Sequence, residues 1–178
     1  MAASYTYQTS SDFINKLEFD YIETYSFQRG AAFDADIHSY RSLADKAKLN
    51  ALSTYEKTDL SILIEKGMVQ HLVCEDGKLH PSREKTHCFN KTDAITEQII
   101  NLLKIEAIDV PMWMCTPFYR DAVIFYDNNG VIVAALNICF SCEYMALGNY
   151  FQRVDADQKT YRLFRQLFVE LGHQIEDR

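Results

Sequence analysis

The residues with the clearest potential for chemistry are Cys139 and Cys142, which form a C-x-x-C pattern. Thiolates at this spacing can hold a zinc ion, and Cys115, Cys88 or His87 would complete a set of four ligands. The chain has no second C-x-x-C pair, and the motif ends a predicted strand without a glycine. If that strand continued, Cys139 and Cys142 would point to opposite faces. A zinc site on Cys115, Cys139 and Cys142 is therefore the less favoured interpretation, and we expect no cofactor.

Thiol redox chemistry is a second interpretation of the same motif. A helix over Glu143–Leu147 would lower the pKa of a thiol at its N-terminus. A thioredoxin-like site also needs a later proline, but all three prolines of the chain precede the motif. The favoured interpretation is structural, with the cysteines packed as small apolar side chains beside Phe140 and Ile138. All five cysteines are then expected to be reduced and mostly buried: Cys74, Cys88, Cys115, Cys139 and Cys142.

Two polar clusters give weaker signals. Arg120 precedes Asp121 at the start of a predicted strand, where an arginine can clamp a carboxylate or a phosphate. An ion pair at the end of the sheet is the more common reason for such a sequence. Asp34, Asp36 and His38 are spaced as D-A-D-I-H, which suits a metal or a general base, but an ordinary helix cap is the interpretation we favour. No H-x-x-x-H or H-E-x-x-H motif occurs, so no catalytic residue is assigned.

The element that has to position these residues is a hairpin over about 119–140. Its arms, 121–126 and 131–140, are apolar on both faces, and Asn129-Gly130 suits the positive φ of a tight turn, which predicts a central, covered hairpin. Helices are predicted for 37–52, 53–66, 92–106 and 155–171, and an edge hairpin for 68–74 and 78–88. We therefore expect a single globular domain over 1–178, of α+β class, with an antiparallel sheet and helices packed against it.

The stretch from Thr92 to Cys142 resembles a segment of many uncharacterised bacterial proteins. In those proteins a helix and a cysteine-containing loop precede a hairpin of the form R-(D/H)-A-(I/V)-x-F-Y-D-x-x-G, which closes with I-C-F-x-C. The matching residues here are Cys115, Arg120, Asp121, Ala122, Val123, Phe125, Tyr126, Asp127, Gly130, Ile138, Cys139, Phe140 and Cys142. The resemblance covers under a third of the chain and implies a shared fold unit in a bacterial setting, with no named activity.

Charge limits the classes of partner. The net charge is −7, with 18 lysines and arginines against 25 aspartates and glutamates. This balance argues against nucleic-acid binding, which depends on clustered cations, and it permits a basic protein partner. The sequence begins without a basic and apolar leader, and its longest apolar run, 131–136, is far too short to cross a membrane. We therefore expect a cytoplasmic protein without membrane contact.

These observations lead to two hypotheses of different classes. The favoured one is a non-enzymatic protein-binding domain, such as a bacterial immunity or adaptor protein that acts on a basic protein partner. It rests on the acidic charge and on the absence of a catalytic motif. The alternative is a metal- or thiol-dependent enzyme or sensor that uses Cys115, Cys139 and Cys142. The sequence assigns neither the residues that contact a partner nor the oligomeric state.

Overall fold

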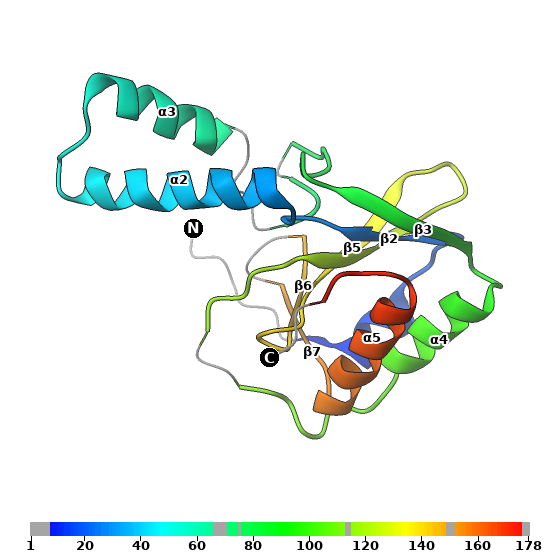
Figure 1. Ribbon diagram of the computed structural model, residues 1–178. Helices are drawn as coiled ribbons and strands as arrows, with labels where there is room; N and C mark the ends of the chain where they lie inside the picture. The colour runs from blue at the N-terminus through cyan, green and yellow to red at the C-terminus, as the bar shows by residue number, and fades with distance from the viewer. Residues whose placement is uncertain (1–7, 66–70, 75, 113–114, 149–151, 176–178) are drawn as a thin grey trace, which may run out of the picture.

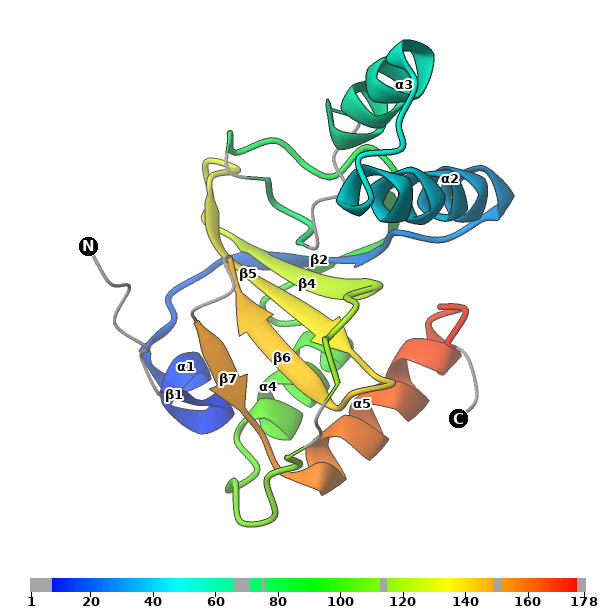
Figure 2. The same cartoon turned by 90° about the vertical axis from the view of Figure 1, so that its left-hand side faces the viewer.

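A seven-stranded sheet forms the centre of the molecule (Figures 1 and 2). The structure is a computed structural model that describes residues 8–65, 71–74, 76–112, 115–148 and 152–175. The strands are β1 (Gln8–Thr9), β2 (Tyr21–Ser26), β3 (Glu84–Asn90), β4 (Asp121–Tyr126), β5 (Ile132–Cys139), β6 (Tyr144–Leu147) and β7 (Arg153–Asp155). Their order is β1-β7-β6-β5-β4-β2-β3, and all neighbours are antiparallel except β1 and β7. The predicted α+β class is confirmed.

The predicted central hairpin is formed by β4 and β5, which lie inside the sheet. Every residue of β4 is buried, and its side chains alternate between two apolar clusters. Val123 belongs to one cluster and Ala122 to the other, as the pleat of a strand covered on both faces requires. At the turn Gly130 has a φ of +78°, and the Asp127 carboxylate accepts hydrogen bonds from the backbone of Asn129 and Val131.

Three helices cover one face of the sheet: α1 (Ser10–Lys16), α4 (Ala94–Leu103) and α5 (Gln158–Glu170). Figure 2 shows α4 and α5 lying side by side under the strands. Ile99 and Leu103 of α4 and Phe164 and Phe168 of α5 are fully buried there, together with Leu136 of β5. Because α5 has a strongly amphipathic sequence, one side of it packs on the sheet and the other meets solvent.

The other face is covered by irregular segments over 71–74 and 76–83. The buried Asn137 of β5 holds the first of them, because its Oδ1 accepts a hydrogen bond from the backbone N–H of Leu72 at 2.8 Å. The predicted hairpin of 68–74 with 78–88 is confirmed only near its turn. An antiparallel bridge joins Val73 to Leu79, with hydrogen bonds from Cys74 to Lys78 and from His80 to Leu72, and 68–70 lie outside the described residues. The later residues of the predicted hairpin form β3 instead, which pairs with β2 at the sheet edge.

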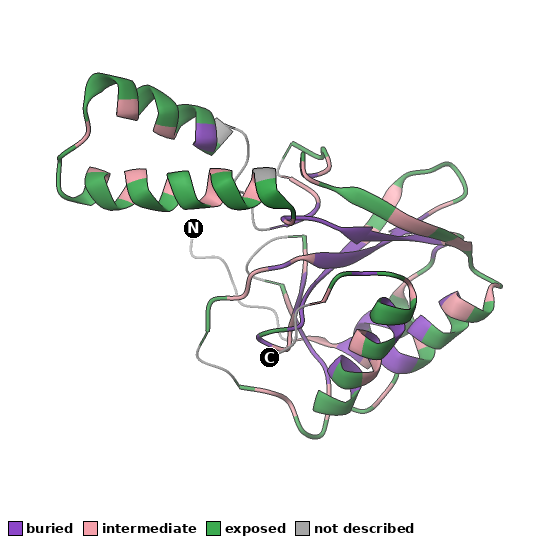
Figure 3. Cartoon of the chain, in the orientation of Figure 1, coloured by how far each residue is buried: buried purple, intermediate pink, exposed green. Residues whose placement is uncertain are grey.

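Helices α2 (Ala31–Lys48) and α3 (Thr54–Glu65) pack mainly on each other and project from the sheet as an arm (Figure 1). We call residues 31–65 the helical arm. Most residues of the helical arm are exposed, and both of its helices are accordingly coloured largely green in Figure 3. Helix α2 begins at Ala31, before the predicted start at Ile37. None of the described helices combines the length and the apolar character that a membrane crossing requires.

The buried His71 predicts a dependence of stability on pH. Its ring stacks on Tyr119 with centroids 5.0 Å apart, and burial lowers the pKa of His71 from 6.5 to about 4. In the unfolded chain the imidazole takes up a proton below pH 6.5, whereas in the folded chain it does so only below about pH 4. The free energy of unfolding should therefore fall as the pH drops through this window, by up to about 3 kcal/mol.

This expectation is checked by urea unfolding at several pH values between 4 and 7. The variant His71→Gln should lose less stability across this pH window than the wild type, because it lacks the imidazole of His71. His38→Gln is the control, because it removes a histidine that is exposed on α2 and not one that is buried. Parallel profiles for the wild type and His71→Gln would contradict the assignment.

Candidate functional site

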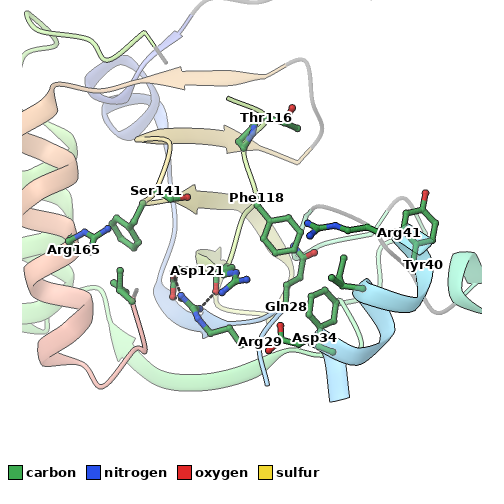
Figure 4. Close-up of a pocket in the computed structure, with 16 residues that line it drawn as sticks. Gln28, Arg29, Asp34, Tyr40, Arg41, Thr116, Phe118, Asp121, Ser141 and Arg165 are labelled. Carbon is green, nitrogen blue, oxygen red and sulfur yellow. Dashed lines mark hydrogen bonds and ion pairs between the residues drawn. The ribbon is translucent and has the colours of Figure 1, made fainter. Parts of the chain in front are cut away.

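A cavity of about 590 Å³ opens between the helical arm and the sheet (Figure 4). We call it the arginine cleft. It is bounded by the N-terminal half of α2, the segment that leads into β4, the turn between β5 and β6, and the C-terminal part of the chain around α5. The lining residues are Gln28, Arg29, Phe33, Asp34, Ile37, Tyr40, Arg41, Thr116, Pro117, Phe118, Arg120, Asp121, Phe140, Ser141, Arg165 and Ile175.

Four arginines line this cleft: Arg29, Arg41, Arg120 and Arg165. They are half of the eight arginines in a chain whose net charge is −7. The lining contains two acidic residues, Asp34 and Asp121. In Figure 4 Arg41 enters from α2 on one side of the cavity and Arg165 enters from α5 on the other. The cleft is thus a local concentration of positive charge on an acidic protein.

The innermost charges are paired with each other. Arg29 binds Asp121 through both terminal nitrogens, with N–O distances of 3.0 and 2.8 Å, and it also donates to the backbone carbonyl of Arg120. The Arg29 side chain is 15% exposed and that of Asp121 is 2% exposed. Gln28 is held next to this pair, because its Nε2 donates to the carbonyl of Tyr119 at 2.7 Å. This geometry fixes the floor of the cleft before any ligand arrives.

Asp121 also binds His173, which joins the end of the chain to the sheet. The Nδ1 of His173 lies 2.8 Å from Oδ1 of Asp121, and its Nε2 lies 2.9 Å from Oγ1 of Thr86. An Asp–His–hydroxyl sequence is the order of groups found in nucleophilic triads. Here the Thr86 hydroxyl donates to the carbonyl of Thr24, and neither Thr86 nor His173 lines the cleft. The network therefore has a structural role: it links the C-terminal part of the chain to the sheet.

Two other arginines of the cleft, Arg120 and Arg165, lie against aromatic rings. The guanidinium of Arg120 is 5.2 Å from the centroid of Phe118, and that of Arg165 is 6.0 Å from the centroid of Phe140. Cation–π contacts of this kind help to position a guanidinium at the cavity wall. Asp121 does form an ion pair at the sheet end, as the favoured interpretation of Arg120-Asp121 expected, with Arg29 as its cationic partner.

The candidate cysteines lie beside the cleft. Cys115 and Cys142 are joined by a disulfide, with Cα atoms 6.3 Å apart, so the expectation of five reduced cysteines is not met. Cys139 is free and buried, and its Sγ accepts a hydrogen bond from the backbone N–H of Phe118 at 3.3 Å. Among the described residues no group of three His, Cys, Asp or Glu side chains is arranged to hold a metal ion.

Two local predictions around these cysteines are corrected by the backbone. Strand β5 ends at Cys139, and the chain turns before Cys142, so both side chains belong to the same apolar cluster instead of opposite faces. The helix expected over Glu143–Leu147 is strand β6, which pairs with both β5 and β7. In the described part of the chain, the C-x-x-C motif is therefore followed by a strand and not by a helix N-terminus.

The D-A-D-I-H residues are divided between two cavities. Asp34 lines the arginine cleft, whereas Asp36 and His38 line a second cavity of about 490 Å³ between α2 and α3. They do not form one cluster. Asp34 lies in the first turn of α2, where a carboxylate is favourable, but the residue before the helix is Gly30 and supplies no side-chain cap.

Sequence reasoning selected Arg120 but missed Arg29, Arg41 and Arg165. Arg29 immediately precedes Gly30, which suits a loop, where function concentrates, and this was the one local signal available. Arg41 and Arg165 lie within helices, and nothing in their neighbours distinguishes them from ordinary surface arginines.

Comparison of the chain with known proteins finds no matching family model, no matching curated protein and no matching solved structure. The function of the chain has therefore to be inferred from the chemistry of the cleft itself.

Proposed function

We propose that this chain is a non-enzymatic binding domain that holds an acidic segment of a protein partner in the arginine cleft. One observation carries the proposal: half of the arginines of an acidic chain line a single cavity. Random placement of surface arginines gives no reason for such a concentration, whereas recognition of a carboxylate does.

The lining suits a peptide that presents both acidic and apolar side chains. Arginine binds carboxylates through two parallel N–H···O bonds, which gives direction as well as strength. Phe33 and Phe118 lie 6.3 Å apart between centroids and offer an apolar surface beside Arg41 and Arg120. A cavity of about 590 Å³ is within the usual range for ligand sites and can take a few side chains.

The helical arm supports a macromolecular partner over a small anion. Helix α2 lines the cleft with Phe33, Ile37 and Tyr40 and then continues away from the sheet (Figure 1). The arm carries four exposed large apolar side chains: Leu49, Tyr55, Ile62 and Ile64. A partner seated in the cleft can therefore extend its contact along the arm, toward the roughly 800 Å² per partner that a stable interface buries.

The favoured sequence hypothesis named a basic protein partner, from the net charge of −7. That charge is compatible with a basic surface elsewhere on the same partner, but the cleft itself selects an acidic group. A partner with both features would be steered by long-range charge and fixed by the cleft. Immunity and adaptor proteins work by such occupation of a partner, without chemistry of their own, and this is the role we propose.

Binding of a defined probe tests the proposal. We expect a fluorescein-labelled peptide of alternating glutamate and phenylalanine to raise its anisotropy on addition of the protein. Arg41→Gln and Arg165→Gln should each weaken binding by about tenfold, the cost of one charge-assisted contact. Raising the salt concentration from 0.05 to 0.5 M should weaken binding further, because screening shortens the reach of the arginine charges.

Two controls make the result specific. Arg83→Gln removes an exposed arginine outside the cleft and should leave the affinity unchanged. A peptide of alternating lysine and phenylalanine should not compete with the acidic one. Equal affinity of Arg41→Gln, Arg165→Gln and Arg83→Gln would overturn the proposal, and preferential binding of the lysine peptide would restore a basic partner as the favoured one.

A further inference from the structure

A disulfide connects two segments of the wall of the arginine cleft. Cys115 immediately precedes Thr116, Pro117 and Phe118, all of which line the cavity. Cys142 immediately follows Ser141, which also lines it. The bond thus ties the segment before β4 to the turn between β5 and β6, across a sequence separation of 27 residues.

The third cysteine holds the same segment without a covalent bond. Phe118 donates its backbone N–H to Sγ of Cys139 at 3.3 Å, and that sulfur also lies 3.3 Å from the hydroxyl of Ser141. Within the disulfide Cys142 is buried and Cys115 is exposed, so a reagent in solvent reaches the bond from the Cys115 side.

The segment that joins α4 to β4 is held at both of its ends. At the cleft the carbonyl of Tyr119 accepts a hydrogen bond from Nε2 of Gln28 at 2.7 Å. Ile108 and Asp109 donate their N–H groups to the Asp157 carboxylate at 3.1 and 2.9 Å. Arg153 donates to the carbonyl of Pro111 at 3.2 Å. Cleavage of the disulfide would leave residues 115–118 with weak contacts only: the N–H···S bond of Phe118 to Cys139, the ring contact of Phe118 with Phe33, and a 3.7 Å contact of the Thr116 carbonyl with Sγ of Cys142. The cleft wall would therefore lose order.

We propose that the Cys115–Cys142 disulfide is a redox switch of the arginine cleft, so that reduction by a dithiol weakens the binding of an acidic segment. This inference rests on the proposed function of the cleft. A thiolate of the dithiol attacks Sγ of Cys115, the S–S bond breaks, and Cys142 leaves as a thiolate that takes up a proton. The second thiol of the reductant then displaces Cys115 as a thiol and forms the oxidised, disulfide form of the reductant.

The experiment compares the oxidised protein, the protein reduced with dithiothreitol, and the protein reoxidised after removal of the reductant. The readouts are anisotropy of the labelled glutamate–phenylalanine peptide and hydrogen exchange at the Phe118 amide. We expect reduction to weaken peptide binding by about tenfold, because the wall has to be ordered again on binding. Reduction should also accelerate exchange at Phe118, and reoxidation should restore both values.

Variants separate the disulfide from general thiol effects. Cys115→Ser should bind the peptide as weakly as the reduced wild type, with or without dithiothreitol. Cys88→Ser removes an exposed free cysteine and should respond to the reductant as the wild type does. Circular dichroism confirms that each form is folded.

The outcomes distinguish this inference from the proposed function. Equal peptide affinity in the oxidised and reduced states would overturn the switch and leave the binding function in place. Free thiols at Cys115 and Cys142 in air-oxidised protein would also overturn it. If the peptide binds neither state, the proposed function fails, and the exchange at Phe118 alone decides whether the disulfide orders the wall.

Discussion

Replacing Asp121 by alanine should lower the free energy of unfolding by about 3–5 kcal/mol, the usual cost of removing one partner of a buried ion pair. Asp121 is 1% exposed and accepts hydrogen bonds from two groups that come from distant parts of the chain. Without its carboxylate, the guanidinium of Arg29 and the imidazole of His173 would remain largely buried without their acidic partner. The cost comes from this loss of compensation more than from the lost attraction itself.

Urea unfolding at pH 7 followed by circular dichroism measures this effect. Asp45→Ala is the matched control, because Asp45 forms an ion pair with Lys48 in which both side chains are over 70% exposed. Its removal should change stability by less than about 0.5 kcal/mol. A double-mutant cycle adds a second readout: Arg29→Met with Asp121→Leu should cost less than the two single changes together. A loss below about 1 kcal/mol for Asp121→Ala would contradict a buried role for the carboxylate.

The central hairpin could be predicted because its signals are local. The apolar residues of 121–126 and 132–139 and the Asn-Gly turn between them lie within twenty residues of sequence. The two apolar faces of these strands also predicted their place inside the sheet, since a strand covered on both sides has to be apolar on both sides. Local propensity and tertiary environment agree here, and the prediction succeeded for that reason.

The predicted hairpin of 68–74 with 78–88 holds only near its turn, because the pairing of its later residues is not local. Asp76-Gly77 does form a turn, in which Cys74 donates its N–H to the carbonyl of Lys78 at 2.7 Å. The partner of β3, however, is β2, from which it is separated by more than fifty residues. Strand pairing depends on which neighbour offers free backbone groups and a matching face, and a turn signal alone carries no information about a distant strand.

The arginine cleft illustrates a similar limit. Arg29 and Asp121 are 92 positions apart in the sequence and meet only because β2 and β4 are neighbours. The sequence-local reading associated Asp121 with the adjacent Arg120, although neighbouring side chains of a strand point to opposite faces. The four arginines become a site only when the sheet order and the position of α2 are known.

The helical arm shows why the start of α2 was missed. Hydrophobic periodicity detects a helix through the stripe that it buries, but α2 packs mainly on α3 and buries little. In its first turns Phe33 continues the stripe of Ile37 and Tyr40 toward the N-terminus, but these side chains line the cleft instead of a packed core. Their place beside the cleft wall could be learned only from the structure.

Leu136→Ala should lower the free energy of unfolding by about 2–5 kcal/mol, the range for large-to-small changes in a packed core. Leu136 lies in the middle of β5, opposite Val123 of β4 and Leu147 of β6, and is 0% exposed. Its side chain belongs to the cluster covered by α1, α4 and α5. Truncation removes buried methyl groups and leaves a cavity that the surrounding strands and helices cannot close without losing other contacts.

Chemical denaturation of Leu136→Ala and of Ile138→Ala, which changes the next inward position of β5, measures this effect at two neighbouring sites. Ile138 is also 0% exposed, so both variants should fall in the same range. Val133 lies on the same strand and is 45% exposed. Val133→Ala should therefore lower the free energy of unfolding much less, because part of the Val133 surface stays in water in both states. If Leu136→Ala and Val133→Ala destabilised the protein equally, this face of β5 would not form the packed core, and the support of the cleft floor by β4 and β5 would have to be reconsidered. We expect a large difference in stability between these two variants. The strand pair that buries Leu136 also holds Asp121 at the base of the cleft, so the packing of this sheet supports the cleft as well.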